Sequence, residues 1–437
     1  MISSSHVPSL SIVLTEITLL QARRNGEPAS QTFSSQCTVR LLVKNQSGIN
    51  PLTPYHIRES ISFTNGVNMM KKQDKKNSKD ILIFDAHCDT VYNLFDSVID
   101  FSQRTQGHVD LPKSRSGGLK AQVFALYVNP VYAPHRSLKK ALLLYHTLEQ
   151  KVFLPGYGRK VTSTAEMNAA ERDNRLAYWL SLEGGHIIEN SIEILEFFSS
   201  LGIRSMTLTH SKNTDWADSS GEPPRWDGLN ALGKQIVTRM EALHMVIDVS
   251  HVSDKTVEDV LDVTTAPFMA SHSNARALCG IPRNLPDNLI QEIAGRNGYI
   301  GVNFFPAFLK KSIFDQVSKN VEKYERHHQD ILQRKTEEPD FVSKAESDLF
   351  KKYVEGSASV DVSAVVDHIV HIADVGGIDC VGLGSDFDGI TSTPSDLTDV
   401  SCYPTLIEEL AERGFHSQEI QKIMGLNLFH FLQHFDP

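Results

Sequence analysis

A histidine and a carboxylate two residues apart stand at the end of the apolar run formed by residues 81–85. The sequence there reads Asp85-Ala-His87-Cys-Asp89. Because successive side chains of a strand point to opposite faces, His87 and Asp89 point the same way and could share one metal ion. Imidazole nitrogen and carboxylate oxygen both suit zinc. One such pair alone is weak evidence, since a hydrogen-bonded strand end can have the same composition.

Three further candidate ligands also follow apolar runs. Glu183 precedes two glycines, which allow close backbone approach, and a glutamate there could bridge two metals. His251 and His272 close two later runs. One metal would be held by His87 and Asp89, the other by His251 and His272, with Glu183 between them. Two metals can share and acidify a water and polarise a carbonyl, so this set predicts hydrolase chemistry.

Two more carboxylates follow the last apolar run, in the string Gly384-Ser-Asp386-Phe-Asp388-Gly389. A carboxylate beside a bridging hydroxide could orient it, take its proton and pass the proton to the leaving amine. We expect Asp386 to be this catalytic carboxylate, with Asp388 as the alternative. Both could instead serve only as turn residues before Gly389.

Eight apolar and β-branched runs position these residues, and each is followed by a segment with helical periodicity. They are residues 81–85, 121–128, 176–182, 204–209, 245–250, 267–271, 299–305 and 380–384. Nearly continuous hydrophobic strands separated by helices indicate a parallel sheet buried on both faces. Eight of them predict an α/β fold, a (β/α)8 TIM-type barrel of the metal-dependent hydrolase kind. Such barrels take their catalytic groups from the C-terminal strand ends, where the candidate ligands stand.

The length in excess of a minimal barrel lies partly in residues 133–175 and mainly in residues 306–361. Residues 306–361 contain apolar side chains at helical spacing among charged ones, so we expect an inserted amphipathic helical excursion. Those side chains are Ile313, Phe314, Val317, Val321 and Tyr324. Residues 1–79 are rich in polar residues and end in a lysine-rich stretch typical of a solvated linker. We expect residues 1–79 to be a poorly ordered N-terminal extension and residues 80–437 to form the catalytic domain.

The composition disfavours several classes of protein. The 437-residue chain has 43 Lys and Arg against 53 Asp and Glu, and this net charge of −10 argues against nucleic-acid binding through a basic surface. No apolar run reaches the roughly 18 residues of a spanning helix, and we recognise no secretory signal. The five cysteines are widely spaced, so we expect no disulfide framework. A cytoplasmic location is the simplest interpretation.

Longer strings around these residues follow one another in a fixed order. They include Asp85-Ala-His-Cys-Asp-Thr90, His108-Val-Asp-Leu-Pro112, Glu183-Gly-Gly-His186, Ile247-Asp-Val-Ser-His251, Ser271-His-Ser-Asn274, Arg283-Asn-Leu-Pro-Asp287 and Gly384-Ser-Asp-Phe-Asp-Gly389. From about residue 80 to its end, the chain resembles the membrane (renal) dipeptidase family, peptidase family M19, and most closely its soluble bacterial members.

The resemblance implies a dipeptidase with two zinc ions per chain, which hydrolyses L-Xaa-L/D-Xaa by a hydroxide bridging the two metals. It places the metal ligands on the five residues named above and adds two residues. His210 would polarise the substrate carbonyl and help to hold the oxyanion. Arg283 would bind the free C-terminal carboxylate of the dipeptide. By analogy with the relatives, a homodimer is possible.

The sequence also departs from the family pattern. Ala86 and Cys88 stand where Gly and Asn are usual, although neither is a candidate ligand. Residues 430–437 are polar at their close, so we expect no lipid anchor of the kind found in animal members, and no membrane attachment.

Two alternatives remain open. The chain could be another binuclear-metal amidohydrolase, acting on a lactone, cyclic amide or phosphoester, or a catalytically inactive barrel used for binding. Many such amidohydrolases bridge their metals with a lysine at the end of the fourth strand. Here that run ends in Thr207-Leu-Thr-His210 and has no lysine, which favours the dipeptidase.

Overall fold

A computed structural model describes residues 12–18, 38–45, 48–51, 81–97, 99–334 and 338–437. The chain divides into two units, Met1–Asn77 and Ser78–Pro437. In the first unit, β1 (Ile12–Thr18), β2 (Thr38–Asn45) and β3 (Gly48–Pro51) form an antiparallel sheet. The expected poor order of residues 1–79 concerns mostly residues outside the described ones and stays a prediction.

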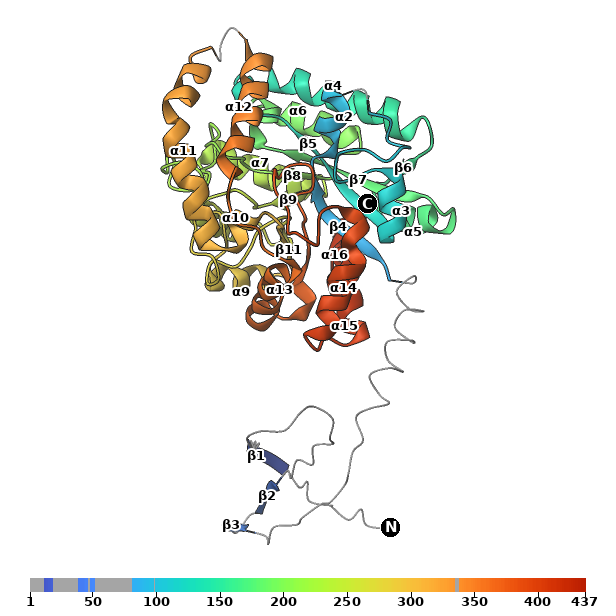
Figure 1. Ribbon diagram of the computed structural model, residues 1–437, viewed down its shortest axis with the longest axis vertical. Helices are drawn as coiled ribbons and strands as arrows, with labels where there is room; N and C mark the ends of the chain where they lie inside the picture. Colours follow the sequence, from blue (N-terminus) through green and yellow to red (C-terminus); the bar gives the residue numbers. More distant parts are fainter. Residues whose placement is uncertain (1–11, 19–37, 46–47, 52–80, 98, 335–337) are drawn as a thin grey trace, which may run out of the picture. The chain divides into compact units, whose positions relative to one another are not determined.

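The second unit is a closed barrel of parallel strands (Figure 1). Its eight strands are β4 (Ile83–Cys88), β5 (Leu119–Tyr127), β7 (Leu176–Glu183), β8 (Ser205–Thr207), β9 (Val246–Asp248), β10 (Met269–Ala270), β11 (Tyr299–Val302) and β12 (Val381–Leu383). Each pairs with the next, and β12 closes on β4 through Leu383 and Asp85. The short β6 (Gly158–Lys160) adds to β7 outside the barrel. The predicted (β/α)8 barrel is confirmed, and every predicted run overlaps one strand.

Helices follow the strands and cover the barrel. They include α2 (Thr90–Asp96), α3 (Leu111–Gly117), α4 (Ser137–Leu148), α5 (Thr164–Arg172), α6 (Ile192–Ser200), α7 (Ala231–Ala242), α8 (Asp254–Val263), α9 (Asp287–Gly295), α13 (Val362–Gly376), α14 (Tyr403–Glu412), α15 (Ser417–Gln421) and α16 (Asn427–Leu432). Several begin at a residue whose side chain accepts a backbone N–H of the first turn, as Ser191, Asn230 and Ser253 do. These caps fix the ends of the loops that precede α6, α7 and α8, among them the loop that carries His251.

The helical excursion follows β11. It consists of α10 (Pro306–Leu309), α11 (Lys311–Leu332) and α12 (Pro339–Val354), and the two long helices lie side by side (Figure 1). The apolar stripe predicted for this segment is the packed face of α11. Ile313 and Val317 are buried, and the other three residues of the stripe pack partly buried against the same core.

The helix α12 contacts residues of the segments that follow the first two barrel strands, including α2 and α4. The Tyr132 hydroxyl donates to Asp340 at 2.5 Å, and the Lys140 ammonium lies 3.7 Å from the same carboxylate. The hydroxyls of Tyr92 and Ser343 are 2.9 Å apart. The excursion is therefore anchored at the C-terminal end of the barrel, where the candidate ligands stand.

Two properties of the described residues bear on the expected location. No described helix combines the length and the apolar composition needed to cross a bilayer. The described cysteines, Cys88, Cys279, Cys380 and Cys402, are free thiols.

Candidate metal centre

The barrel strands bring the five predicted ligands to one place. His87 lies inside β4, Glu183 ends β7, and His251 and His272 lie in the loops that follow β9 and β10, three and two residues after the strand ends. Asp89 is the N-cap residue of α2, but its side chain caps no backbone group of the helix. All five side chains are buried except that of His251, which is 12% exposed. Their burial requires that polar partners, or a cation, compensate them.

The two carboxylate oxygens of Glu183 face different histidines. Oε2 lies 3.5 Å from Nε2 of His87, which is itself 3.5 Å from Oδ2 of Asp89. Oε1 lies 3.3 Å from Nε2 of His251 and 3.6 Å from Nε2 of His272. The structure therefore gathers these residues in the same two groups as the sequence-based expectation, with Glu183 between them. Their role as ligands stays a prediction.

Several buried atoms of this cluster have no hydrogen-bond partner among the described residues. They are Nδ1 and Nε2 of His87, Oδ1 of Asp89 and Oε2 of Glu183. A buried polar atom without a partner costs about 1–3 kcal/mol, and a bound cation would remove this cost for acceptor atoms. Three sets of side chains could each hold an ion: His87, Glu183 and His272; Glu183, His210 and His251; His87, Asp89 and Asp386. Imidazole nitrogens and carboxylate oxygens are a donor set that fits zinc.

Burial and neighbouring charges set the protonation of the cluster. Burial lowers the pKa of His251 and His272 well below the ordinary histidine value, so both are neutral, the form that binds metals. Burial also acts to lower the pKa of His87, but the Glu183 and Asp89 carboxylates outweigh it and raise that pKa well above the usual value. Burial raises the pKa of Asp89 to about 7. The Glu183 and Asp89 carboxylates thus favour a positive charge at His87, which a bound metal ion would supply in place of the proton.

Asp386 lies against this cluster. Its Oδ1 is 4.0 Å from Nε2 of His87, and Asn303 donates to its Oδ2 at 2.8 Å. Burial raises the pKa of Asp386 to about 7. Asn303 was not identified from the sequence, although its place directly after β11 could have signalled it, because the other site residues also lie at or near the C-terminal ends of barrel strands.

Asp388 points elsewhere. Its carboxylate accepts hydrogen bonds from the Thr90 hydroxyl and from the backbone N–H of His108, both at 2.6 Å. Asp388 therefore ties the loop before α3 to the start of α2. Of the two aspartates, Asp386 is the one beside the candidate ligands.

Three of these residues adopt a left-handed backbone, which non-glycine residues rarely do. The φ angles are 68° at His251, 61° at Asp386 and 69° at Asp388. This conformation costs roughly 1–2 kcal/mol for each residue with a Cβ atom. The strand-to-loop turns after β9 and β12 therefore hold these side chains in place at the expense of local strain.

His210 lies at the rim of the cluster. Its Nε2 is 3.8 Å from Oε1 of Glu183, and its ring centre is 4.4 Å from that of His251 and 4.8 Å from that of Tyr127. Burial lowers the pKa of His210 to about 3, so its ring is neutral and has one N–H to donate. The side chain is 21% exposed and so is open to a ligand.

Arg283, from the loop between β10 and α9, also reaches the cluster. Its Nη1 donates to the Ser273 hydroxyl at 2.7 Å and its Nη2 to the backbone carbonyl of His272 at 2.8 Å. Its Nε is buried without a partner among the described residues. Burial lowers the pKa of Arg283 to about 10, which still leaves the guanidinium charged at neutral pH. The group is a fixed cation with unused donors.

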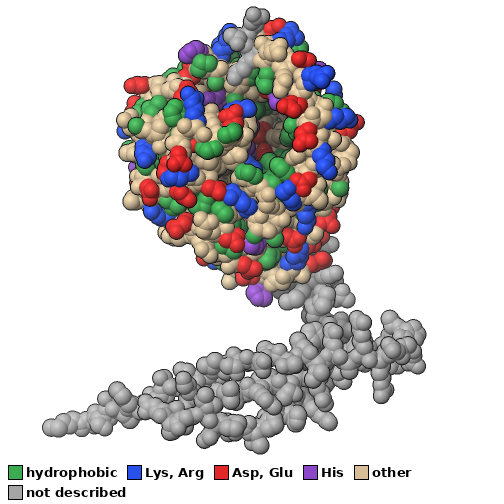
Figure 2. All heavy atoms as spheres, turned by 90° about the vertical axis from the view of Figure 1, so that its left-hand side faces the viewer, with side chains coloured by type: hydrophobic (Ala, Val, Ile, Leu, Met, Phe, Trp, Pro, Cys, Tyr) green, Lys and Arg blue, Asp and Glu red, His purple; other side chains and the backbone are tan. Residues whose placement is uncertain are grey.

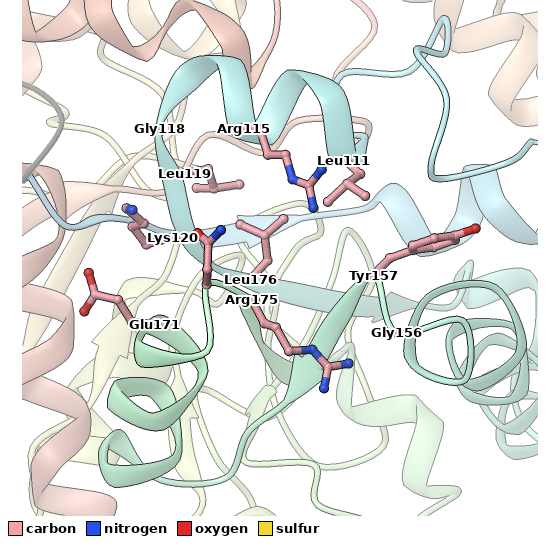
Figure 3. A pocket seen from close by; sticks show the side chains of 11 residues that line it. Leu111, Arg115, Gly118, Leu119, Lys120, Gly156, Tyr157, Glu171, Arg175 and Leu176 are labelled. Atoms are coloured by element: carbon pink, nitrogen blue, oxygen red, sulfur yellow. The ribbon is translucent and has the colours of Figure 1, made fainter.

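The surface is hollowed on the face that Figure 2 presents, and acidic side chains are visible inside the hollow. A separate cavity of about 270 Å³ lies at the opposite, N-terminal ends of β5 and β7, against Leu119 and Leu176 (Figure 3). Arg115 and Arg175 both line it, and Arg175 donates to the Gly158 carbonyl at 3.1 Å. This second cavity contains none of the candidate ligands.

Comparisons with known proteins identify the family of the chain. Residues 72–436 match the family model described as membrane dipeptidase, peptidase family M19. The chain is 31% identical over 336 residues to dipeptidase aclJ of Aspergillus oryzae, an alignment that covers 75% of this chain and 69% of the relative.

Two solved structures are similar. The probable dipeptidase PvdM from Pseudomonas aeruginosa has a TM-score of 0.73 and 25% identity, and the match covers 84% of this chain and 98% of that one. A metallo peptidase from Rhodobacter sphaeroides, liganded with a phosphinate mimic of the dipeptide L-Ala-D-Ala, has a TM-score of 0.66 and 25% identity, with 81% and 99% covered. The chain therefore belongs to the membrane dipeptidase family, peptidase family M19, and is a metallopeptidase that hydrolyses the peptide bond of dipeptides.

Proposed function

We propose that the chain is a zinc-dependent dipeptidase with a centre of two zinc ions. One ion is held by His87 and Asp89, the other by His251 and His272, and Glu183 bridges them. The observation that carries this proposal is the carboxylate of Glu183, whose two oxygens face the two groups of histidines separately. A zinc pair in such a centre supplies hydroxide from water near neutral pH and polarises the scissile carbonyl.

Asp386 takes the proton of the attacking water and delivers it to the leaving amine. Its Oδ1 is turned toward His87, and its Oδ2 is held by Asn303, so one oxygen stays free to exchange a proton beside the centre. Burial acts to raise the pKa of this carboxyl group above its ordinary value, which favours exchange of a proton near neutral pH.

His210 stabilises the negative charge that develops on the substrate carbonyl oxygen. Its Nδ1 lies 3.2 Å from the Ser211 hydroxyl, which can donate to it and leave the ring proton on Nε2. That Nε2 is the atom nearest to Glu183 and faces the cluster. A neutral donor already in position costs no reorganisation during the reaction.

Arg283 binds the C-terminal carboxylate of the substrate. Ser273 and the His272 carbonyl hold the guanidinium beside the His251 and His272 ligands, and its burial strengthens a contact with an anion. Fixing the carboxylate and the peptide bond at once selects a substrate of two residues. The related Rhodobacter sphaeroides structure holds a mimic of L-Ala-D-Ala, which supports acceptance of a D-residue at the second position.

Hydrolysis of L-Ala-L-Ala, L-Ala-D-Ala and L-Ala-L-Ala-L-Ala, with metal content determined on the same samples, tests the proposal. We expect two zinc ions per chain, cleavage of both dipeptides but not of the tripeptide, loss of activity on chelation, and recovery with zinc. If the protein binds metal but cleaves none of these peptides, the site would instead act on a lactone, cyclic amide or phosphoester. Cleavage that persists without metal would refute the metal centre.

A further inference from the structure

Asp248, the last residue of β9, is completely buried and receives four hydrogen bonds. Its Oδ1 accepts the backbone N–H groups of Ser250 and Ser271, each at 3.0 Å. Its Oδ2 accepts the hydroxyl of Thr207 at 3.0 Å and that of Ser271 at 2.6 Å. Both oxygens are thus surrounded by donors, which is the arrangement of an ionised carboxylate that only accepts hydrogen bonds.

The Ser271 hydroxyl lies between this carboxylate and a candidate ligand. Its Oγ is 2.6 Å from Oδ2 of Asp248 and 2.6 Å from Nδ1 of His272. A hydroxyl has a single proton, and Asp248 can only accept. Ser271 therefore donates to Asp248 and must accept from His272, which places the ring proton of His272 on Nδ1. Its Nε2 keeps a lone pair, and this is the atom that faces Glu183 and His251.

We propose that Asp248 and Ser271 are positioning residues that fix the tautomer and orientation of His272 and thereby set the affinity of the metal held by His251 and His272. This inference rests on the proposed role of His272 as a ligand. A ligating histidine commonly donates its second N–H to a carboxylate or carbonyl, and loss of that partner typically lowers metal affinity 10- to 100-fold. Here a serine hydroxyl stands between the two groups.

Among the described residues, no equivalent connection reaches the other half of the centre, which is formed by His87 and Asp89. Nδ1 of His87 is buried without a hydrogen-bond partner among the described residues. The hydrogen bonds from Asp248 through Ser271 to His272 therefore affect the binding of one metal and not of the other. Removal of the Ser271 hydroxyl should lower the affinity for one zinc ion and leave the affinity for the second unchanged. This difference distinguishes a positioning role from a general loss of structure.

The test is a stepwise competition of the dizinc protein with a chromophoric chelator, for wild type, Ser271→Ala and Ser271→Thr. We expect Ser271→Ala to weaken one of the two zinc ions about 10- to 100-fold, and Ser271→Thr, which keeps the hydroxyl, to restore it. Thr207→Val is the matched control. It removes a different hydroxyl from the same oxygen of Asp248 but leaves the contact with His272 intact, so both zinc affinities should stay near those of wild type.

Asp248→Asn gives a second test that keeps the side-chain volume. Its amide would donate to Ser271, which would then donate to Nδ1 of His272 and move the ring proton to Nε2, the metal-binding atom. We expect this variant to lose the same zinc ion more completely than Ser271→Ala does. Equal effects of Ser271→Ala and Thr207→Val, or unchanged affinities in both Ser271→Ala and Asp248→Asn, would overturn the inference. Failure of the wild-type protein to bind two zinc ions would instead overturn the proposed function.

Discussion

The Nε2 atoms of His251 and His272 lie 2.7 Å apart, and both face the same oxygen of Glu183. The two histidines come from neighbouring strand ends, and each is neutral because burial lowers its pKa. Two ring nitrogens and a carboxylate oxygen that converge in this way are a donor set that could hold a cation.

Replacing His251 by alanine should remove one metal ion and nearly all hydrolysis while leaving the fold intact. A bound metal contributes several kcal/mol to such a reaction, so we expect activity to fall at least about a hundredfold. Metal content, dipeptide cleavage and circular dichroism measure this. His244→Ala is the control, since His244 has a similar left-handed backbone, with φ 53° against 68°, but is exposed and away from the cluster. Two metals retained in His251→Ala would contradict the assignment.

Asp386→Asn and Asp388→Asn should have different effects. Without a proton acceptor beside the centre, Asp386→Asn should lower kcat about 10²- to 10⁴-fold, with KM and metal content nearly unchanged. Asp388→Asn should mainly lower the thermal stability, because Thr90 and His108 lose a charged acceptor. Steady-state kinetics and thermal unfolding of both variants provide the comparison. A loss of kcat in Asp388→Asn as large as in Asp386→Asn would contradict the assignment of Asp386 as the catalytic carboxylate.

Arg283→Ala should chiefly weaken substrate binding. A hydrogen bond to a charged group contributes about 1.5–3 kcal/mol, so we expect KM for L-Ala-L-Ala to rise roughly 10- to 100-fold. The amidated dipeptide lacks the carboxylate and should react similarly with the variant and the wild type. Metal analysis checks that His272, whose carbonyl Arg283 contacts, still holds its ion. Comparable KM values for the free dipeptide in both proteins would show that Arg283 does not bind the substrate carboxylate.

His368 of α13 should make stability depend on pH. The backbone N–H of Ala275 donates to its Nδ1 at 3.0 Å and its Nε2 lies 3.1 Å from the Leu309 carbonyl, which requires a neutral ring. Burial lowers its pKa from 6.5 to about 4. Because the folded-state pKa is the lower one, this contribution is complete above pH 6.5 and is lost as the pH falls toward 4.

For His368, the loss between about pH 7.5 and about pH 5 amounts to about 2 kcal/mol of unfolding free energy. Urea unfolding at both pH values measures it. In His368→Gln, the amide can accept from Ala275 and donate to Leu309 without titrating, so this part of the pH dependence should disappear. An equal pH dependence in the variant and the wild type would show that other groups cause it.

The barrel could be predicted because its strands are buried on both faces. Every residue of β7 is buried, and such a strand gives an uninterrupted apolar run in the sequence. The strand ends were less predictable. The run at residues 81–85 indicated an end near Asp85, but β4 continues to Cys88, so His87 lies within the strand. Periodicity detects burial, and hydrogen bonding between strands decides where a strand ends.

The alternation of side chains along a strand could not decide between Asp386 and Asp388 as the catalytic carboxylate. Two residues separated by one would share a face if the strand continued, but β12 ends at Leu383 and both aspartates are left-handed. Their side chains therefore diverge, one toward His87 and the other toward His108. The contact of Asn303 with Asp386, like that of Tyr132 with Asp340, joins residues far apart in sequence and leaves no local pattern.

The closure of the barrel at Asp85 determines when the centre can form during protein synthesis. The buried Asp85 carboxylate in β4 accepts hydrogen bonds from the backbone and hydroxyl of Ser385 and from the hydroxyl of Tyr403. A ribosome delivers these partners about 300 residues after Asp85. Until then, the nascent chain has an open sheet edge and carries its histidines in an unfinished barrel. We therefore expect the metal centre to form only after β12 has been synthesised, and a chain that ends before Val381 lacks the strand that closes the barrel.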